Sequence, residues 1–290
     1  MKRILPNTTI LNSLRCPICR GHFSLRGAEL AQGSVSLICD GARKHCYDLS
    51  ASGYVNLMPP GHTDAGDSKA AVRARTEFLN TDLYRPAAEA LAALLEKHLD
   101  SKDCVVLDAG CGEGYYTEIL ARNGASYLGV DLSRAAVDTA SKRMGRSGHD
   151  NGFFCVGSVF EIPVEDRSCA AIVNIFAPCA EEEFLRALSP RGILLVAYAG
   201  ADHLMGMKRT IYDTVKENDE RADLPKQMKK IDEIRVHYQI CVETETQIRN
   251  LFAMTPYYWR TSPTDAEKLC GLNSLETEVD MIFSVYQKDE

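Results

Sequence analysis

Residues 104–116, CVVLDAGCGEGYY, determine the fold that we expect for this chain. The first residues are small or apolar and lead into Asp108, and three glycines then alternate with other residues before an apolar-periodic stretch. This pattern predicts a strand, a glycine-rich turn and a helix. Glycine lets the backbone lie against a ligand, and the free N–H groups at the helix start can donate to it. We therefore expect the polar end of a ligand at Gly110, Gly112 and Gly114.

The spacing of these glycines distinguishes between two cofactor classes. In the dinucleotide fingerprint the third glycine would fall at position 115, where this chain has Tyr115, so NAD is disfavoured. The form D-x-G-x-G-x-G, followed by a predicted strand at 126–130 and then Asp131, is similar to the motif of class I S-adenosylmethionine (SAM) methyltransferases. The resemblance implies that the loop starting at Asp108 binds SAM and that Asp131 accepts both ribose hydroxyls. The alternative is a turn that uses glycine only for tight packing.

Length and composition indicate an ordinary globular protein. With 290 residues, the chain can bury a full core. Polar residues and Pro6 interrupt the apolar residues near the start, which argues against a signal peptide, and no window suits a membrane span. Eleven cysteines are an odd number in a chain that is long for a disulfide scaffold. We expect a cytoplasmic protein with no membrane partner.

The charge is unevenly distributed. The chain carries a net charge of -7, yet residues 1–60 contain seven Lys and Arg against three Asp and Glu. A basic module attached to an acidic body is expected where the module contacts phosphates. Chance unevenness in a short segment explains the charge alone equally well.

The basic segment also has metal-ligand spacing. Cys16 and Cys19 form a C-x2-C pair, and Cys39 and His45 form a second pair that a hairpin would bring alongside. Three thiolates and one imidazole suit a closed, tetrahedral structural zinc site, and the metal would supply much of what folds so short a segment. Cys46 is the main rival to His45, and His22 is a further alternative.

The rest of the chain alternates between strand and helix patterns. Strands are expected at residues 126–130, 152–159, 170–175, 193–199, 233–242 and 275–287, and helices at 69–80, 86–98, 134–144, 181–188 and 203–215. With the strand before the glycine turn, this predicts a Rossmann-like, seven-stranded α/β sheet of the class I methyltransferase type with a small N-terminal zinc-binding module. We expect the module at 1–60, a flexible link at 61–68 within a helical lead-in at 61–100, and the methyltransferase domain at 101–290.

Several motifs together are similar to a narrower family. The N-terminal C-P-x-C…C…H pattern, GYVNL at 53–57, YRP at 84–86, LDAGCGEGYY, FAPC at 176–179, HLM at 203–205, and MTP with the later WR resemble 23S ribosomal RNA guanine-N1 methyltransferases. The resemblance covers nearly the whole chain. It implies SAM contacts at Tyr84, Gly112, Glu113 and His203, and an RNA-recognition role for the zinc module.

The remaining candidate residues are placed by position. Ser158 and Val159 follow the third strand, where many SAM enzymes have an acid that meets adenine, so the Ser158 hydroxyl and Val159 amide are expected to take that role. Strand C-termini gather ligands, which makes Phe176 with Pro178 the candidate shelf for a nucleobase, with core packing as the alternative for Phe176. Guanine N1 carries a proton, so methyl transfer to it calls for a base or for electrostatic stabilisation of the deprotonated ring. The sequence offers Glu113, His203 and Asp166 without choosing among them.

Two other functions fit the same sequence. One is a SAM enzyme that acts on a small molecule, in which the zinc module only stabilises the chain. The other is a non-catalytic module that binds zinc, SAM and RNA. A homodimer would let two basic modules contact one RNA, and the sequence leaves the oligomeric state open.

Overall fold

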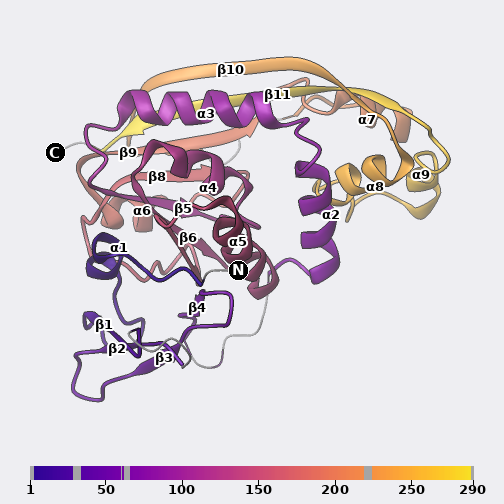
Figure 1. Cartoon of the computed structure of the whole chain (residues 1–290). Coiled ribbons are helices and arrows are strands. Elements are labelled where there is room, and N and C mark those ends of the chain that lie inside the picture. The colour runs from indigo at the N-terminus through magenta and orange to yellow at the C-terminus, as the bar shows by residue number, and fades with distance from the viewer. Residues whose placement is uncertain (1–2, 29–33, 60, 62–65, 219–223, 289–290) are drawn as a thin grey trace.

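The computed structural model describes residues 3–28, 34–59, 61, 66–218 and 224–288. Within these ranges the chain forms a three-stranded antiparallel sheet and an eight-stranded mixed sheet. Figure 1 shows the small sheet at one end of the molecule and a group of helices, α7 to α9, at another, with the large sheet between them. Residues 62–65 of the expected flexible link lie outside the described residues.

The elements follow the alternation expected from the sequence. The helices are α1 (Thr8–Ser13), α2 (Lys69–Leu79), α3 (Arg85–His98), α4 (Tyr115–Leu120), the 3-10 turn η1 (Ala121–Asn123), α5 (Arg134–Ser147), α6 (Glu181–Ala187), α7 (Met205–Ile211), α8 (Glu245–Ala253) and α9 (Pro263–Glu267). The strands are β1 (Phe23–Arg26), β2 (Ser36–Cys39), β3 (Cys46–Asp48), β4 (Val55–Asn56), β5 (Val105–Ala109), β6 (Ser126–Asp131), β7 (Gly152–Val156), β8 (Cys169–Ile175), β9 (Leu188–Ala199), β10 (Lys229–Val242) and β11 (Leu275–Gln287).

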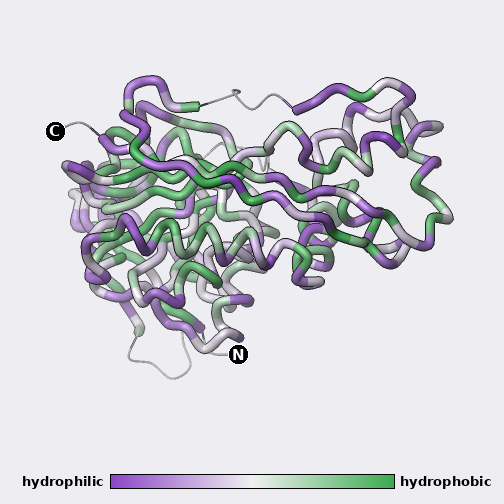
Figure 2. The backbone as a smooth tube through the Cα atoms, turned by 90° about the horizontal axis from the view of Figure 1, so that it is seen from above, coloured by the Kyte–Doolittle hydropathy of each residue, from purple (hydrophilic) through white to green (hydrophobic). Residues whose placement is uncertain are grey.

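The large sheet has the order β10-β11-β9-β8-β5-β6-β7-β4. The strands from β9 to β4 are parallel, and β10 and β11 add an antiparallel pair at one edge. The middle strands β5 and β7 are buried along their whole length, and Figure 2 shows the central strands as largely hydrophobic. Such strands need helices on both faces. From β5 the chain adds β6 and β7 on one side of the sheet and then β8 and β9 on the other. In such sheets ligands bind at the carboxyl ends of the strands, at the point where this order reverses.

Two apolar layers cover the two faces of the sheet. On one face, α3, α4 and α5 pack against side chains such as Val106 and Tyr127. On the other face, α1, α6 and the small sheet pack against alternate residues of the same strands, such as Leu107 and Leu128. The core of the small sheet is therefore continuous with that of the large one. The division of the chain at residue 60 stays a prediction.

The seven expected strands form as β5 to β11, and an eighth strand joins them at the edge of the sheet. The segment GYVNL forms β4, which pairs in parallel with β7: Val55 lies opposite Cys155 and Asn56 opposite Val156. Val55 is fully buried. Without β4, β7 would be the edge strand and its outer backbone groups would be unpaired. The N-terminal segment supplies the strand that pairs with this edge.

Several predicted bounds were wrong. The third strand ends at Val156, and the Gly157 N–H makes the last ladder bond to β6, to Asp131 O (3.0 Å). Strand β9 begins at Leu188 and β10 at Lys229, both earlier than expected. The helix expected at 203–215 is α7, which begins after Leu204 because that residue has a positive φ of 57°.

Candidate cofactor and metal sites

The three glycines of the loop after β5 have different surroundings. All three have positive φ, at 83° for Gly110, 54° for Gly112 and 78° for Gly114. A Cβ on Gly110 would lie 2.5 Å from Ala177 Cβ, and one on Gly114 would lie 2.8 Å from Ala140 Cβ. Among the described residues, a Cβ on Gly112 would meet the Arg75 guanidinium alone, at 3.8 Å. Gly110 and Gly114 thus permit close packing, whereas Gly112 leaves open space where a ligand can approach the backbone.

Three acidic residues surround this loop. Burial raises the pKa of Asp108 to about 7, although the Thr117 hydroxyl donates to its Oδ2 (2.5 Å). Burial also raises the pKa of Asp131, whose two carboxylate oxygens accept the N–H groups of Gly112 (3.0 Å) and Ser133 (2.8 Å). Each of those oxygens keeps a second lone pair for a ligand hydroxyl. The Asp131 carboxylate is therefore already oriented at the end of β6, as the sequence predicts.

Glu113 has an acceptor atom left over. The residue is 2% exposed, and its Oε1 is buried without a hydrogen-bond partner among the described residues. Burial raises the pKa of this carboxyl, and the nearby Arg75 opposes that rise. An unpaired buried acceptor is costly unless a ligand donates to it. This side of the loop thus offers an acceptor to a donor group of a ligand.

Arg75 is a site residue that the sequence did not single out. It lies on α2, beside Gly112, and pairs with Asp67 (2.6 Å). The sequence signal was only a basic residue on a predicted amphipathic helix. Nothing in that pattern shows that α2 would pack beside the glycine loop.

His203 is held as a neutral imidazole at the same edge of the sheet. Burial lowers the pKa of its ring to about 4. Its Nδ1 accepts the backbone N–H of Asp280 (3.2 Å), so the proton of the neutral ring is on Nε2. Nε2 lies 3.4 Å from the hydroxyl of Tyr84, which is also buried. The structure therefore brings together Tyr84 and His203, two residues 119 positions apart.

Phe176 covers the other side of His203. Its ring stacks on the imidazole, with centroids 5.8 Å apart and planes at 24°, and the residue remains 50% exposed. Phe176 has a positive φ of 50°, which turns the chain sharply after β8. Asn174, which the sequence analysis did not assign, donates from Nδ2 to Ala109 O and Pro178 O (both 3.2 Å). Asn174 thus ties the Phe176 turn to the end of β5. The core-packing alternative for Phe176 does not fit this exposure.

Ser158 and Val159 begin the loop after β7. Gly157, next to Ser158, donates to the backbone of Asp131, so the loop starts beside the acid expected to bind ribose. The Ser158 hydroxyl accepts the N–H of Phe160 (3.1 Å), while Val159 is 8% exposed. Contact of these two residues with adenine stays a prediction.

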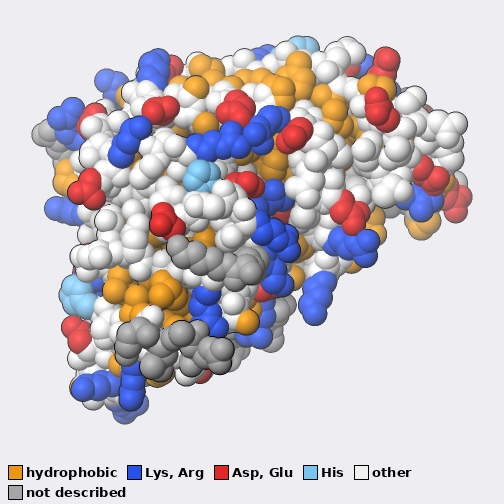
Figure 3. Space-filling view, in the orientation of Figure 1, with side chains coloured by type: hydrophobic (Ala, Val, Ile, Leu, Met, Phe, Trp, Pro, Cys, Tyr) orange, Lys and Arg blue, Asp and Glu red, His pale blue; other side chains and the backbone are white. Residues whose placement is uncertain are grey.

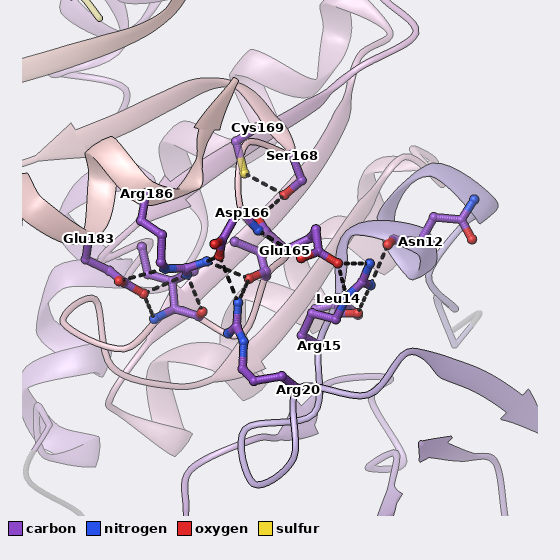
Figure 4. A network of polar contacts seen from close by, with 12 residues as sticks. Asn12, Leu14, Arg15, Arg20, Glu165, Asp166, Ser168, Cys169, Glu183 and Arg186 are labelled. Carbon is purple, nitrogen blue, oxygen red and sulfur yellow. Dashed lines mark hydrogen bonds and ion pairs between the residues drawn. The ribbon is translucent and has the colours of Figure 1, made fainter. Parts of the chain in front are cut away.

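Asp166 is not near the other candidates for a base. Its carboxylate accepts from Arg186 (2.6 Å) and Arg20 (3.3 Å), which lower its pKa, and its side chain is 61% exposed. Figure 4 shows it within a network that joins the N-terminal segment to the loop before β8. Two arginines hold Asp166 in its ionised form on the surface, which is unsuitable for abstracting a proton from a bound base.

The four expected metal ligands lie together. The ligand atoms of Cys16, Cys19, Cys39 and His45 are all within 4.8 Å of one another. Cys19 Sγ and Cys39 Sγ are 3.6 Å apart, and His45 Nδ1 is 3.5 Å from the sulfurs of Cys16 and Cys39. Tetrahedral zinc would separate two sulfurs by about 3.8 Å and sulfur from nitrogen by about 3.5 Å.

The electrostatics of this cluster favour a thiolate at Cys16. Burial opposes ionisation of Cys16, but hydrogen bonds from the Tyr47 hydroxyl and from backbone N–H groups lower its pKa to about 7. The thiolate is the form that binds metal. Cys46 is exposed and lies outside the cluster, as does His22. The residues present therefore fit a closed site with three thiolates and His45 Nδ1.

Together, the sheet and its loops define a class of protein. A parallel sheet that reverses at β5 carries a glycine loop, a carboxylate at the end of the next strand and an open edge with an exposed aromatic ring. The orphaned Glu113 oxygen and the open space at Gly112 fit a small molecule with a donor group and a ribose. This arrangement is typical of nucleoside-binding enzymes of the Rossmann-like type.

Comparison with known proteins agrees with this class. Residues 100–254 match the family model described as a methyltransferase domain. This match spans more than half of the chain, so the chain belongs to the methyltransferase family, and its sheet has the class I methyltransferase fold. No helix in the described ranges has both the length and the apolar character to span a membrane.

The relatives extend the match beyond that domain. A protein of Micromonospora griseorubida assigned as a 23S rRNA (guanine-N(1)-)-methyltransferase is 28% identical over 282 residues, which cover 88% of this chain and 89% of the relative. The 23S rRNA (guanine(748)-N(1))-methyltransferase of Streptomyces fradiae is 32% identical, over 67% of this chain and 66% of that one. A ribosomal protein L11 methyltransferase of Clostridium botulinum is 29% identical, over 36% of this chain and 34% of the relative.

Proposed function

We propose that this protein transfers the methyl group of SAM to N1 of a guanine in 23S ribosomal RNA. The observation that carries the proposal is the reach of the Micromonospora match, which covers 88% of the chain and so extends well beyond residues 100–254. Both relatives that match most of the chain are named for guanine-N1 methylation of 23S rRNA. The shorter match, to a protein-modifying enzyme, covers only about a third of the chain.

The acidic loop suits a cationic cofactor. When bound, SAM supplies a methyl group on a positively charged sulfonium. Asp131 would accept the ribose hydroxyls, and the free Oε1 of Glu113 would accept the cofactor's ammonium group. Asp108 adds a third buried carboxyl beneath the loop. The His203 Nε2–H then donates to the Tyr84 hydroxyl, which leaves the Tyr84 O–H as a donor at the far side of the site.

The hydrogen bonds of Glu113, His203 and Asp166 bear on which of them could act as the general base. Guanine N1 must lose a proton before or during methyl transfer. His203 uses Nδ1 as an acceptor and carries a proton on Nε2, and Asp166 is held at the surface by two arginines. Glu113 has a raised pKa, and its Oε1 has no partner among the described residues, but that oxygen is the one proposed to accept the cofactor's ammonium group. We therefore assign none of the three as the base.

The target base has to leave its stacked context to reach the methyl group. Phe176 provides an exposed aromatic face at the carboxyl edge of β8, and Asn174 holds the turn on which it lies. Pro178 is exposed on the same turn. Stacking of the base on Phe176 would orient its N1 edge towards the cofactor.

The RNA would need basic surface next to this edge. Figure 3 shows Lys and Arg side chains gathered over the region of α2 and α5, beside the glycine loop. The N-terminal module carries further basic residues, of which Arg20 is already engaged with Asp166. We propose that zinc folds this module and that RNA phosphates lie across both regions. The homodimer stays a prediction.

Transfer of labelled methyl from SAM tests the proposal. The purified protein is incubated with unmodified 23S RNA or with its hairpin fragments, and the product is mapped by reverse transcription, which N1 methylation blocks. We expect one strong stop at a guanine. Transfer to a small molecule without RNA would support the small-molecule alternative. SAM and RNA binding without any transfer would support the non-catalytic module.

A further inference from the structure

The loop between β7 and β8 links the two candidate sites. We call residues 157–167 the adenosine-side loop, because they begin at Gly157, whose N–H donates to Asp131 O, and continue through Ser158 and Val159. The other end of the loop runs along the N-terminal segment. Leu14 and Val164 form an antiparallel bridge, and Ile162 and Val164 are fully buried.

The first support of this loop comes from the residue just before the metal-binding pair. The Arg15 N–H donates to Pro163 O (2.9 Å), and the Glu165 N–H donates to Ser13 O (2.7 Å). The Arg15 guanidinium, of which only 5% is exposed, forms an ion pair with Glu165 and also donates to the carbonyls of Asn12 and Leu14. Figure 4 shows these contacts between the N-terminal segment and the loop.

The second support comes from the residue just after that pair. Arg20 donates from Nη2 to Val164 O (2.7 Å) and to Asp166 (3.3 Å). Arg186 of α6 donates to the same Val164 carbonyl and to Asp166. The loop backbone is therefore clamped between α6 on one side and the metal-binding turn on the other.

The positions of Arg15 and Arg20 depend on the turn that joins Cys16 to Cys19. That turn is closed by the bonds Arg20 N–H to Cys16 O (2.8 Å) and Cys16 N–H to Gly21 O (2.9 Å). Exposed ion pairs such as the one between Arg20 and Asp166 are too weak to fix a turn by themselves. A metal bound by Cys16 and Cys19 would fix it, since such ions supply much of the folding free energy of small modules.

We propose that metal binding at the Cys16, Cys19, Cys39 and His45 cluster strengthens cofactor binding, because Arg15 and Arg20 transmit the order of the metal-binding turn to the adenosine-side loop. This inference rests on the proposed function in that the ligand is taken to be SAM. The coupling is reciprocal by thermodynamic necessity, so the cofactor strengthens metal binding by the same factor.

Calorimetry without RNA tests the coupling. S-adenosylhomocysteine is titrated into the full-length protein, once loaded with zinc and once after chelation. We expect its dissociation constant to rise at least about fivefold on chelation, and zinc loss to a chelator to slow when the ligand is present. Equal dissociation constants in the two forms would overturn the inference alone. No binding to the zinc-loaded protein would overturn the proposed function as well.

A variant separates coupling from simple unfolding of the chelated module. Glu165→Gln combined with Asp166→Asn removes the carboxylate charges that pair with Arg15 and Arg20, and it alters neither a metal ligand nor the glycine loop. We expect the zinc-loaded variant to bind S-adenosylhomocysteine several-fold more weakly and to lose less on chelation than the wild type. Glu245→Gln, which removes an exposed Arg249 pair on α8, is the matched control. A zinc-loaded double variant with wild-type affinity would contradict the inference.

Hydrogen exchange gives a second readout that does not depend on affinity. The amides of Ile162 and Glu165 bond to Glu183 and Ser13 respectively. Exchange at these amides should accelerate in the double variant while amides of β5 keep their protection. Unchanged exchange in the loop would show that Arg15 and Arg20 do not order it.

Discussion

The backbone N–H of Asp280 donates to Nδ1 of His203, at 3.2 Å. This bond fixes the tautomer of a buried ring, and the Asp280 carboxylate is itself fixed by Arg235 (2.6 and 2.7 Å) and by the Asp202 N–H (3.0 Å). The last strand of the sheet thus orients a side chain that comes from the loop after β9. The Nε2–H of His203 is therefore directed at the Tyr84 hydroxyl (3.4 Å).

The low pKa of His203 makes stability depend on pH. The folded-state pKa is about 4, below the ordinary 6.5, so the unfolded chain takes up this proton first as the pH falls. Stability associated with neutral His203 is present above pH 6.5 and is lost as the pH falls to about 4. This difference in the pKa of His203 corresponds to about 3 kcal/mol in the free energy of unfolding. Denaturant unfolding from pH 4 to 8 should show a weaker pH dependence in His203→Asn, whereas His149→Asn should behave like the wild type.

Two glycine substitutions should separate folding from binding. Gly114→Ala places a Cβ 2.8 Å from Ala140 Cβ at a positive φ, and should cost about 2–4 kcal/mol of stability. Gly112→Ala meets no close atom and should cost only about 1–2 kcal/mol, yet it fills the space open to the ligand. We expect Gly112→Ala to fold and to bind S-adenosylhomocysteine poorly by calorimetry. Wild-type affinity in this variant would remove Gly112 from the cofactor site.

Asp131→Ala should abolish cofactor binding. The carboxylate is placed to accept ribose hydroxyls and also holds the Gly112 N–H. Loss of two charge-assisted hydrogen bonds predicts at least about a 100-fold rise in the dissociation constant of S-adenosylhomocysteine. Asp150→Ala, at an exposed position after α5, is the control. Retained micromolar affinity in Asp131→Ala would contradict the ribose assignment.

Phe176 should matter for RNA more than for stability, because half of its surface is exposed. Removal of one base-stacking contact predicts a loss of about 5- to 150-fold in kcat/KM for RNA in Phe176→Ala. Phe176→Tyr keeps the aromatic face and should retain most activity. The comparison is made by single-turnover methyl transfer to the RNA hairpin. Equal rates for the Ala and Tyr variants would exclude a stacking role.

Metal content should follow the geometry of the cluster. Cys39→Ser removes a sulfur that lies 3.6 Å from Cys19 Sγ and should abolish stoichiometric zinc in the purified protein. Cys46→Ser should retain one zinc per chain, since Cys46 is exposed and outside the cluster. Elemental analysis measures the zinc in both variants. The result for Cys46→Ser decides between His45 and Cys46 as the fourth ligand. Zinc lost from Cys46→Ser would reverse that assignment.

The sequence predicts the features that are local in the chain. The strand, the glycine turn and the helix of residues 104–116 form as expected, because hydrophobic period and glycine spacing act within a few residues. The class I methyltransferase fold was confirmed. The ligand spacing around Cys16 likewise predicted four side chains that the structure brings together.

Other features depend on packing between distant segments, which periodicity does not encode. Arg75 lies at the glycine loop only because α2 packs beside it. Asp166 lies away from the site because it precedes β8, at the edge of the sheet opposite to the carboxyl ends of the strands. The hydrogen bond from the Asp280 N–H to His203 Nδ1 joins residues that are 77 positions apart. The pairing of Val55 with Cys155 of β7 likewise joins segments that are far apart in the chain.

The pairing of Val55 and Asn56 with β7 has a practical consequence for anyone who dissects this protein. A truncated protein that starts at residue 61 would lack β4. The apolar strand β7, with Cys155 and Val156, would then be an unpaired edge of the sheet. An unpaired edge strand can pair with the edge of another copy, so the catalytic portion expressed alone is expected to aggregate. Loss of activity in that protein would then not show which part of the chain recognises RNA.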